Sequence, residues 1–559
     1  MIVGIDMGGT NIDGVIIEEG RIIKTIKKAT DRENIFNTID STIKELLVDI
    51  DKSKIEGINL STTVSTNAIV EKKTALVGMV IQAGPGMSYD NLACGNENAF
   101  ISGYIDHRGN VVEELDPGEI KDISKSFKKK GIESCAVVTK FSTRNPQDEI
   151  AIKKILEKDF PTVTMGHTMS GKLNFPRRVY TSYLNSAVHK TFNDFARSIK
   201  KSIEEEGINA PLFILKADGG TMTIDSAEEK PVETILSGPA ASLMGISALL
   251  PTDKDGILLD IGGTTTDIFF LADGVPLFEP LGIKIGKYKT LVRSIYSVSI
   301  GLGGDSSIDI VDGDIVIGPK RQGKPYAFGG PKATPSDAML ALGLTSYGRD
   351  HKEKARESMN ELGQELDLSI DQTAKLVLER IANVIKGSID DLLDKINSHP
   401  VYTIKELLHG KKIEPELINI IGGPAKALAP ILEETMDLPS YYPDNYLVAN
   451  AIGAALARPT MEITMHVDTS KKRLSIPELD IHEKVSPRFD LEKVKEKALD
   501  LVEEKAMSSG TSPHNIDAEI TEESSFNMVR GYSTLGKDIR VKAQIKPGLM
   551  QELRSEYNA

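Results

Sequence analysis

Two segments of the chain, far apart in the sequence, share one pattern of apolar and polar positions. In each, a short apolar run leads into an acidic residue and two glycines, and a second apolar run follows; the two octets are Asp6–Asp13 and Asp260–Asp267. A turn signal, Glu19-Gly20 or Asp273-Gly274, then precedes a third apolar stretch. Apolar runs separated by such turns predict strands joined by tight connections. The pattern therefore predicts a duplicated unit of strand, glycine-rich turn, strand, turn and strand.

The segment between the two copies alternates between helical and strand-like periodicity. Apolar residues recur at helical spacing in four stretches: Ile35–Leu47, Ile120–Lys129, Asp148–Lys158 and Val179–Glu206. Short apolar runs typical of strands occur at Ile58–Ser61, Ala75–Ile81, Ala136–Thr139 and Leu212–Lys216. Interleaved helices and strands predict an α/β fold.

Beyond the second copy the pattern changes twice. Two long helices are predicted over Asp350–Glu365 and Ile370–Ile396, followed by a buried-type strand over Leu417–Ile421. From about residue 460, short alternating strands surround one charged helix, Leu491–Ala506. We therefore expect a first lobe over residues 1–180, a second lobe over residues 181–460 and a small α/β appendage over residues 461–559.

Composition narrows the classes of partner. The chain has 559 residues, of which 40% are hydrophobic and 26% charged, and a formal net charge of −14. An acidic balance argues against nucleic acid or an anionic membrane as the main partner, because both reward a basic face. Two cysteines, Cys94 and Cys135, make neither a disulfide framework nor a cysteine metal site. Met1 leads directly into an apolar strand without a signal peptide, so we expect a cytoplasmic protein.

The two octets carry the candidate chemistry. Backbone N–H groups at adjacent glycines can converge on one anion, with positive φ angles that other residues avoid, and the following threonine adds a hydroxyl donor. We therefore place phosphates at Gly8, Gly9, Thr10, Gly262, Gly263 and Thr264. Asp6 and Asp260, at strand ends, suit Mg²⁺ or activation of water. One copy alone would fit a plain hairpin equally well, whereas two copies facing one cleft can hold a polyphosphate from both sides.

A third glycine pair follows the late strand. Gly422 and Gly423 stand between Ile421 and Pro424. Glycines at a strand end let the backbone lie against a flat ring or a ribose, and proline fits the first turn of a following helix. After two phosphate loops, this turn predicts contact with adenosine, whereas alone it would read as an ordinary strand-to-helix connection.

The order of these three elements resembles the superfamily of sugar kinases, heat-shock chaperones and actin. The resemblance implies a duplicated RNase H-like ATPase fold with two lobes. It also implies ATP as ligand, with the two hairpins holding its phosphates together with Mg²⁺ and the late glycines flanking its adenosine.

Five further segments resemble one branch of that superfamily, the hydantoinase A, 5-oxoprolinase and acetone carboxylase β-subunit family. They are Leu60–Ala68, Asp218–Met222, Pro231–Ala240, Ser299–Ser306 and Gly329–Ala338. Within the first, the polar residues Thr62, Thr63, Thr66 and Asn67 are candidates for substrate contact, although turn hydrogen bonds would explain them equally well. Ser237 is the expected N-cap of a helix over residues 240–250.

Some segments depart from this family or mimic other sites. Residues 174–180, 326–328 and 529–532 differ from the family pattern, which bears on the substrate rather than on ATP. Gly318–Pro325 nearly spells a P-loop, but Pro325 replaces the required serine or threonine and Pro319 removes a donor, so we reject it. His167 and His189 are expected to be structural rather than metal ligands.

The resemblance implies an ATP-dependent hydrolase that opens a cyclic amide or imide through a phosphorylated intermediate, with Asp6 and Asp260 as its catalytic and metal-binding residues. Two alternatives remain: a small-molecule kinase, and a regulatory or activating ATPase that acts on a partner protein. The expected partners are a small cyclic amide or related carbonyl compound, and a second enzyme subunit or another copy of the chain.

Overall fold

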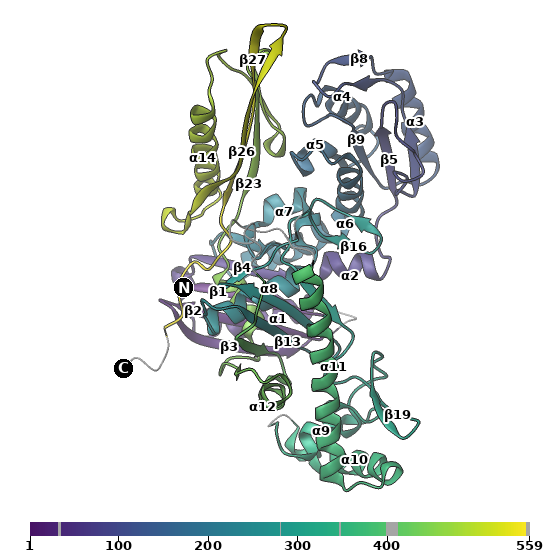
Figure 1. Ribbon diagram of the computed structural model, residues 1–559, viewed down its shortest axis with the longest axis vertical. Helices are drawn as coiled ribbons and strands as arrows, with labels where there is room; N and C mark the ends of the chain where they lie inside the picture. The colour runs from purple at the N-terminus through teal and green to yellow at the C-terminus, as the bar shows by residue number, and fades with distance from the viewer. Residues whose placement is uncertain (32–34, 280, 346–347, 399–411, 555–559) are drawn as a thin grey trace.

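The computed structural model describes residues 1–31, 35–279, 281–345, 348–398 and 412–554. Figure 1 shows a central body from which two modules project at the top and a third at the bottom. The central body begins with strands β1 (Ile2–Met7), β2 (Asn11–Glu18) and β3 (Arg21–Ala29), which form an antiparallel meander. This is the first of the two predicted three-stranded units.

The first sheet extends the meander with later strands, in the order β12-β11-β4-β1-β2-β3. Strand β4 (Gly57–Thr62) is parallel to β1, β11 (Leu212–Leu215) is parallel to β4, and β12 (Thr221–Thr223) is antiparallel to β11. Helices α1 (Ile35–Leu46) and α6 (Phe175–Glu205) supply apolar side chains to the core of this sheet. Residue 180, where we placed a lobe boundary, therefore lies inside α6.

The second sheet repeats the same order of directions. Its path is β15-β14-β13-β21-β22, with β18 also paired to β14. In both sheets an antiparallel meander is followed by two further strands parallel to its first strand. The bounds are β13 (Gly256–Ile261), β14 (Thr266–Ala272), β15 (Val275–Pro276), β18 (Ser297–Ile300), β21 (Leu417–Ile421) and β22 (Ser440–Tyr441). The predicted duplicated α/β fold is thus confirmed.

Two helices rich in small residues pack together between the two sheets. Helix α8 (Ser237–Leu249) crosses α13 (Ala449–Leu456) so closely that a Cβ on Gly245 would lie 2.1 Å from the carbonyl oxygen of Ala449. Likewise, a Cβ on Gly4 of β1 would lie 2.2 Å from the carbonyl oxygen of Ala451 in α13. Such backbone contact requires glycine and leaves little room for the two lobes to slide.

The start of α8 differs by one residue from the prediction. Its N-cap is Leu236, with φ of +64°, rather than Ser237. The Ser237 hydroxyl instead donates a 2.8 Å hydrogen bond to the carbonyl oxygen of Thr62, at the end of β4. The serine therefore ties the helix to the first sheet, a long-range contact that local capping rules do not anticipate.

One upper module is inserted between β4 and α6. Its parallel sheet has the order β10-β9-β5-β6 and follows the short helix α2 (Val64–Val70). The strands and helices are β5 (Val77–Gln82), β6 (Glu97–Phe100), β7 (Tyr104–Ile105), β8 (Val111–Glu113), α3 (Pro117–Lys129), β9 (Ser134–Thr139), α4 (Gln147–Leu156), β10 (Val163–Met165) and α5 (Gly166–Met169). Both cysteines are buried and free in this module, as expected for small apolar side chains.

The second upper module is the predicted C-terminal α/β piece. An antiparallel sheet of order β25-β24-β23-β27-β26 packs against helix α14 (Leu491–Ser508). Its strands are β23 (Glu462–Asp468), β24 (Arg473–Ile476), β25 (Ile481–Lys484), β26 (Ala518–Arg530) and β27 (Ser533–Ile545). Figure 1 shows it beside the first upper module.

The lower module is mainly helical and carries the two predicted long helices. Its elements are β19 (Ile308–Val311), β20 (Asp314–Ile317), α9 (Pro335–Ala341), α10 (Lys352–Leu366) and α11 (Ile370–Ser398). The remaining α-helices and strands of the described residues are α7 (Ile224–Glu229), β16 (Lys284–Ile285), β17 (Tyr288–Lys289) and α12 (Ala425–Met436). Over the described ranges, none of the helices combines the length and apolar character that a membrane span needs.

Candidate nucleotide site

The first glycine-rich hairpin connects β1 to β2 and leaves its tip open. Gly8 N–H donates to the carbonyl oxygen of Asn11 (3.0 Å), and Thr30 donates to the carbonyl oxygens of Gly8 (3.1 Å) and Thr10 (2.9 Å). Neither Gly8 nor Gly9 has a positive φ, contrary to our expectation for these turns. A Cβ on Gly9 would meet no heavy atom within 4 Å. An unusual backbone conformation is therefore not what calls for glycine at these two positions.

The second hairpin connects β13 to β14 and is covered on one side by another loop. Gly262 N–H donates to Thr265 O (2.9 Å), which matches the first hairpin. The loop that follows β18 then donates from Gly304 N to Gly262 O (2.9 Å) and from Asp305 N to Gly263 O (2.7 Å). A Cβ on Gly263 would lie 2.9 Å from the Asp305 carboxylate. Gly262 and Gly263 also lack positive φ.

The acidic residues that precede the glycines lie near the ends of β1 and β13, where Asp6 is buried and Asp260 is half-buried. Asp6 is 7% exposed, and burial raises its pKa to about 7, with the charges of Asp13 and Asp260 adding to the increase. Burial also raises the pKa of Asp260, whose carboxylate accepts a 2.6 Å hydrogen bond from the Ser242 hydroxyl. The charge of Asp260 thus acts on Asp6, so the two carboxylates, one from each hairpin, lie close enough to interact electrostatically.

Two cations beside the hairpins escaped the sequence analysis. Lys27 Nζ contacts both Asp13 carboxylate oxygens at 2.8 Å, and its charge lowers the pKa of Asp6, Asp13 and Asp260 against the effect of burial. The sequence could have predicted this contact, because the Glu19-Gly20 turn fixes the register of β2 and β3 and so places Lys27 directly across from Asp13.

The second cation is Arg321. Its guanidinium contacts the Asp305 carboxylate at 2.8 Å and lies 3.4 Å from the Thr264 hydroxyl at the tip of the second hairpin. Arg321 belongs to the Gly318–Pro325 segment that resembled a P-loop. The segment follows β20, and what it brings to the second hairpin is a guanidinium. Guanidinium groups match the geometry of phosphate oxygens.

The third glycine pair lies against the second hairpin. Gly422 has φ of +91°, and a Cβ there would lie 2.3 Å from Ile261 O and 2.8 Å from an Asp260 carboxylate oxygen. Next to it, Gly423 borders a cavity of about 210 Å³. The other lining residues are Leu344, Thr345, Lys426, Ala427, Tyr442, Asp444 and Tyr446. The structure therefore places Gly423, a predicted nucleotide residue, on the wall of a cavity.

The polar cluster after β4 is largely engaged in internal hydrogen bonds. Thr62 is fully buried, and its hydroxyl accepts from Val64 N (3.2 Å). The Thr66 hydroxyl accepts from Leu236 N (3.0 Å), and Asn67 Nδ2 donates to the Thr63 hydroxyl (3.1 Å). These bonds are what the turn interpretation predicts. Substrate contact by Thr62, Thr63, Thr66 and Asn67 stays a prediction, with exposed Asn67 the most accessible of the four.

The duplicated sheets with paired acidic-diglycine hairpins define a two-lobed α/β protein. The hydantoinase/oxoprolinase family profile matches residues 178–463, and the profile of that family's N-terminal region matches residues 2–160. The chain belongs to the hydantoinase/oxoprolinase family, which confirms the resemblance found in its motifs.

Sequence identity between this chain and individual relatives is low. The chain is 24% identical over 455 residues to the acetophenone carboxylase gamma subunit of Aromatoleum aromaticum, covering 69% of this chain and 61% of that protein. It is 26% identical over 386 residues to caprolactamase subunit alpha of Pseudomonas jessenii, covering 62% and 55%. The nucleotide-free acetone carboxylase structure superposes with a TM-score of 0.70 at 16% identity, covering 99% of this chain and 88% of that one. The chain thus spans about 55 to 61% of these two curated relatives.

Proposed function

We propose that the chain is an ATP-dependent enzyme that activates the carbonyl oxygen of a small molecule. The observation that carries the proposal is the duplicated hairpin with its leading carboxylate, together with the position of Asp260 against Gly422, beside the cavity that Gly423 lines. Two carboxylates whose charges are disfavoured by burial and by each other are costly unless a cation or a proton compensates them. Oxygen ligands of this kind suit Mg²⁺, so the residues present fit a magnesium–nucleotide complex.

Each part of the site has a role in this proposal. Gly9 and Thr10 on one side, and Gly263 and Thr264 on the other, bind the phosphates, and Arg321 faces the second pair. Mg²⁺ held by Asp6 and Asp260 would neutralise charge on the phosphates. The cavity at Gly423, with the rings of Tyr442 and Tyr446 in its lining, takes the adenosine. Phosphoryl transfer depends mainly on such positioning and charge stabilisation.

We propose a cyclic amide or imide as substrate class. The amide oxygen attacks the γ-phosphorus, an O–P bond forms and ADP leaves. Water then adds to the activated carbon, and the C–N bond breaks as the nitrogen takes a proton. A second water releases phosphate from the resulting acyl phosphate by attack at carbon. Two relatives are named as a caprolactamase and an ATP-dependent acetone carboxylase, and caprolactam and acetone both contain a carbonyl group. This supports carbonyl activation as the common step.

The two alternatives differ in their products. A small-molecule kinase would stop at a stable phosphorylated compound, and a regulatory ATPase would respond to a partner protein rather than to amides. The acetophenone carboxylase and caprolactamase relatives are named as subunits, which supports a second subunit as partner of this chain. Activity should therefore be assayed with the chain alone and with the chain together with any subunit that co-purifies with it.

Isotope transfer tests the proposed reaction. Candidate lactams and hydantoins carrying ¹⁸O in the reacting carbonyl are incubated with the chain, ATP and Mg²⁺ in unlabelled water. We expect ADP formation to depend on the amide, a ring-opened acid to appear, and the ¹⁸O to be found in inorganic phosphate. Asp260→Asn should form neither product. Unlabelled phosphate alongside ring opening would contradict transfer to the carbonyl oxygen, and a stable phosphorylated product would instead support the kinase.

A further inference from the structure

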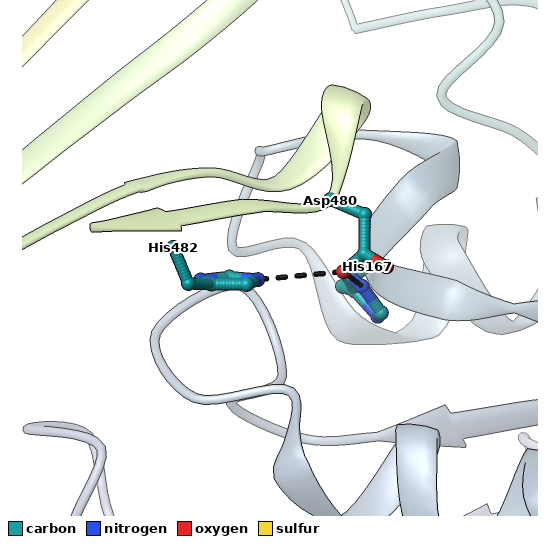
Figure 2. A group of neighbouring side chains, drawn as sticks. All are labelled: His167, Asp480 and His482. Carbon is teal, nitrogen blue, oxygen red and sulfur yellow. Dashed lines mark hydrogen bonds and ion pairs between the residues drawn. The ribbon is translucent and has the colours of Figure 1, made fainter.

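A cluster of two histidines and one aspartate lies away from the hairpins, where the two upper modules meet. His167 comes from α5 in the inserted module, whereas Asp480 immediately precedes β25 and His482 lies within β25 in the C-terminal module. Figure 2 shows the imidazole of His482 directed at the Asp480 carboxylate, with the imidazole of His167 next to that carboxylate. More than 300 residues of sequence separate the two sides, so only the folded molecule assembles the group.

The spacing of the three donor atoms matches a metal coordination sphere. Asp480 Oδ1 lies 3.0 Å from His167 Nε2 and 3.5 Å from His482 Nε2, and all three atoms lie within 4.8 Å of one another. Ligand bonds of about 2.0–2.2 Å in a tetrahedral zinc site place the ligand atoms roughly 3.3 Å apart. A zinc ion would fit with small side-chain adjustments.

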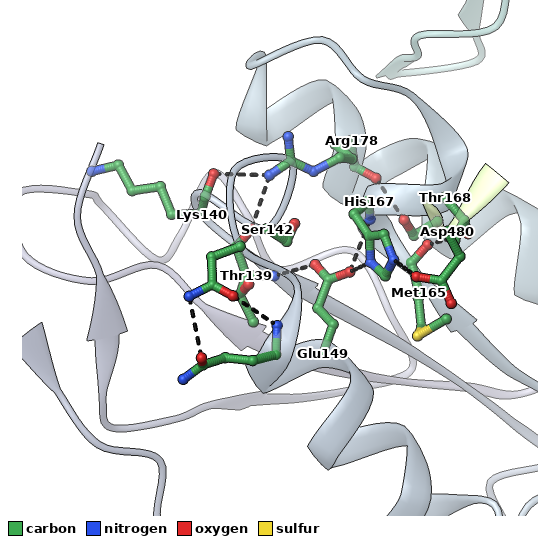
Figure 3. Close-up of polar contacts among 12 residues, drawn as sticks. Thr139, Lys140, Ser142, Glu149, Met165, His167, Thr168, Arg178 and Asp480 are labelled. Atoms are coloured by element: carbon green, nitrogen blue, oxygen red, sulfur yellow. Dashed lines mark hydrogen bonds and ion pairs between the residues drawn. The ribbon is translucent and has the colours of Figure 1, made fainter. Parts of the chain in front are cut away.

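A buried carboxylate fixes the orientation of His167. Glu149 Oε2 accepts from His167 Nδ1 at 2.6 Å and from its backbone N–H at 2.9 Å, while Oε1 accepts from Thr139 N at 2.7 Å (Figure 3). The side chains of Glu149 and His167 are both 0% exposed. With Nδ1 committed to Glu149, Nε2 is the atom directed at Asp480. Histidine ligands in metal sites are oriented in this way by a carboxylate on the second nitrogen.

We propose that His167 Nε2, Asp480 Oδ1 and His482 Nε2 bind one Zn²⁺ ion that joins the inserted module to the C-terminal module. Two imidazoles and one carboxylate favour zinc over magnesium or calcium, which prefer all-oxygen sites. The ion replaces the proton that His167 Nε2 shares with Asp480. Partial exposure of the Asp480 and His482 side chains, 45% and 26%, gives the ion an entry path and a fourth position for water.

The ion would reinforce a junction that the chain already makes. Within a few residues of Asp480, Glu478 accepts hydrogen bonds from Gly171 N (2.7 Å) and Thr464 N (3.1 Å), and its carbonyl oxygen accepts from Lys230 Nζ (3.0 Å). A metal bound on top of these contacts would fix the angle between the modules. The proposal does not depend on ATP or on the proposed reaction.

Calorimetric titration of the EDTA-treated full chain with ZnCl₂ tests the site. We expect one equivalent bound by the native chain, an affinity at least about tenfold lower in His482→Ala, and native affinity in His514→Ala. His514 is an exposed histidine in the 3₁₀ helix Pro513–Asn515 and controls for adventitious binding. His482→Ala leaves the His167–Glu149 contact in place, so its folding can be verified by its melting temperature without metal.

A second readout separates a metal site from a proton-bridged ion pair. Cobalt(II) added to the native chain should give the visible absorption of a tetrahedral site with nitrogen and oxygen ligands, and Asp480→Asn and His482→Ala should each abolish it. Zn²⁺ should raise the melting temperature of the native chain and of His514→Ala but not of His482→Ala. Equal zinc affinity in the native chain and His482→Ala, or no binding by either, would overturn the proposal.

Discussion

The two glycine-rich hairpins have the same backbone pattern but different surroundings. The first has an open tip at Gly9, and its second acidic residue, Asp13, is paired with Lys27. The second is covered by the loop that carries Asp305, and its second acidic residue, Asp267, lies across from Ser299 instead of a lysine. Duplication therefore preserved the strand order and the leading carboxylates, while the space around the glycines diverged. In the proposed site, the first hairpin leaves space for the phosphates at Gly9. The second hairpin is held by the loop that carries Asp305 and has the Arg321 guanidinium beside it.

The largest expected effects are at Asp6 and Asp260, and the comparison of the hairpins fails if only one of these carboxylates is needed for ATP turnover. Asp6→Asn and Asp260→Asn keep the side-chain shape but remove a ligand charge from the proposed magnesium site. We expect each to lower Mg²⁺-dependent ATP turnover by roughly 10²–10³-fold, measured as the rate of ADP release at saturating ATP. Both variants should keep a cooperative thermal transition, because removing a buried charge does not open a cavity. Full turnover by either variant would show that its hairpin does not serve the nucleotide.

Substitutions of the glycines test the two hairpins separately: Gly9 should affect ligand binding at the first, and Gly263 should affect the packing of the second. Gly9→Ala adds a methyl group to open space, so we expect an unchanged melting temperature but at least about a tenfold loss of ATP affinity by calorimetry. Gly387→Ala, on α11, also meets no atom within 4 Å and controls for the substitution itself. Native ATP affinity in Gly9→Ala would place the ligand elsewhere.

Gly263→Ala should act mainly on the fold. Its methyl group would meet the Asp305 carboxylate at 2.9 Å, so we expect a loss of about 1–3 kcal/mol in the free energy of unfolding. Combining it with Asp305→Ala should recover part of that loss, measured by chemical denaturation, because the clash is with the aspartate side chain. A destabilisation that the second change leaves unaltered would mean that Asp305 is not the obstacle.

These contrasts mark how far the sequence could predict the molecule. The repeated octets predicted both meanders and their duplication, because strand periodicity and glycine turns are local signals. The open tip at Gly9 and the covered Gly263 could not be predicted, since the covering loop comes from beyond β18. Arg321 was dismissed with its P-loop-like segment for the same reason: its partners Asp305 and Thr264 are set by tertiary packing. Lys27 was predictable from hairpin register alone.

Arg321 sharpens the comparison, because it brings a guanidinium to Thr264 at the tip of the second hairpin. Arg321→Ala should lower ATP affinity by about tenfold, whereas Arg321→Lys should retain part of it, since lysine keeps the charge but not the planar fork. The measurement is calorimetric titration with ATP and with AMP. AMP affinity should change little if Arg321 faces the outer phosphates, and an equal loss for both nucleotides would place it at the adenosine instead.

The smallest effect concerns the unequal second carboxylates. Burial raises the pKa of Asp267 to about 7, from the ordinary value of 3.8, and the charge of Asp260 adds to this. The folded state therefore holds a proton that the unfolded state releases between about pH 4 and 7, so stability falls as the pH rises through that window. Asp267→Asn removes the cost of the buried charge and should raise the melting temperature of the ligand-free chain by about 2–4 °C at pH 8, and hardly at all at pH 4. In contrast, Asp13→Asn should not stabilise at pH 8, because it leaves Lys27 without its carboxylate partner. Equal responses of the two variants to pH would mean that Lys27 does not compensate the first hairpin.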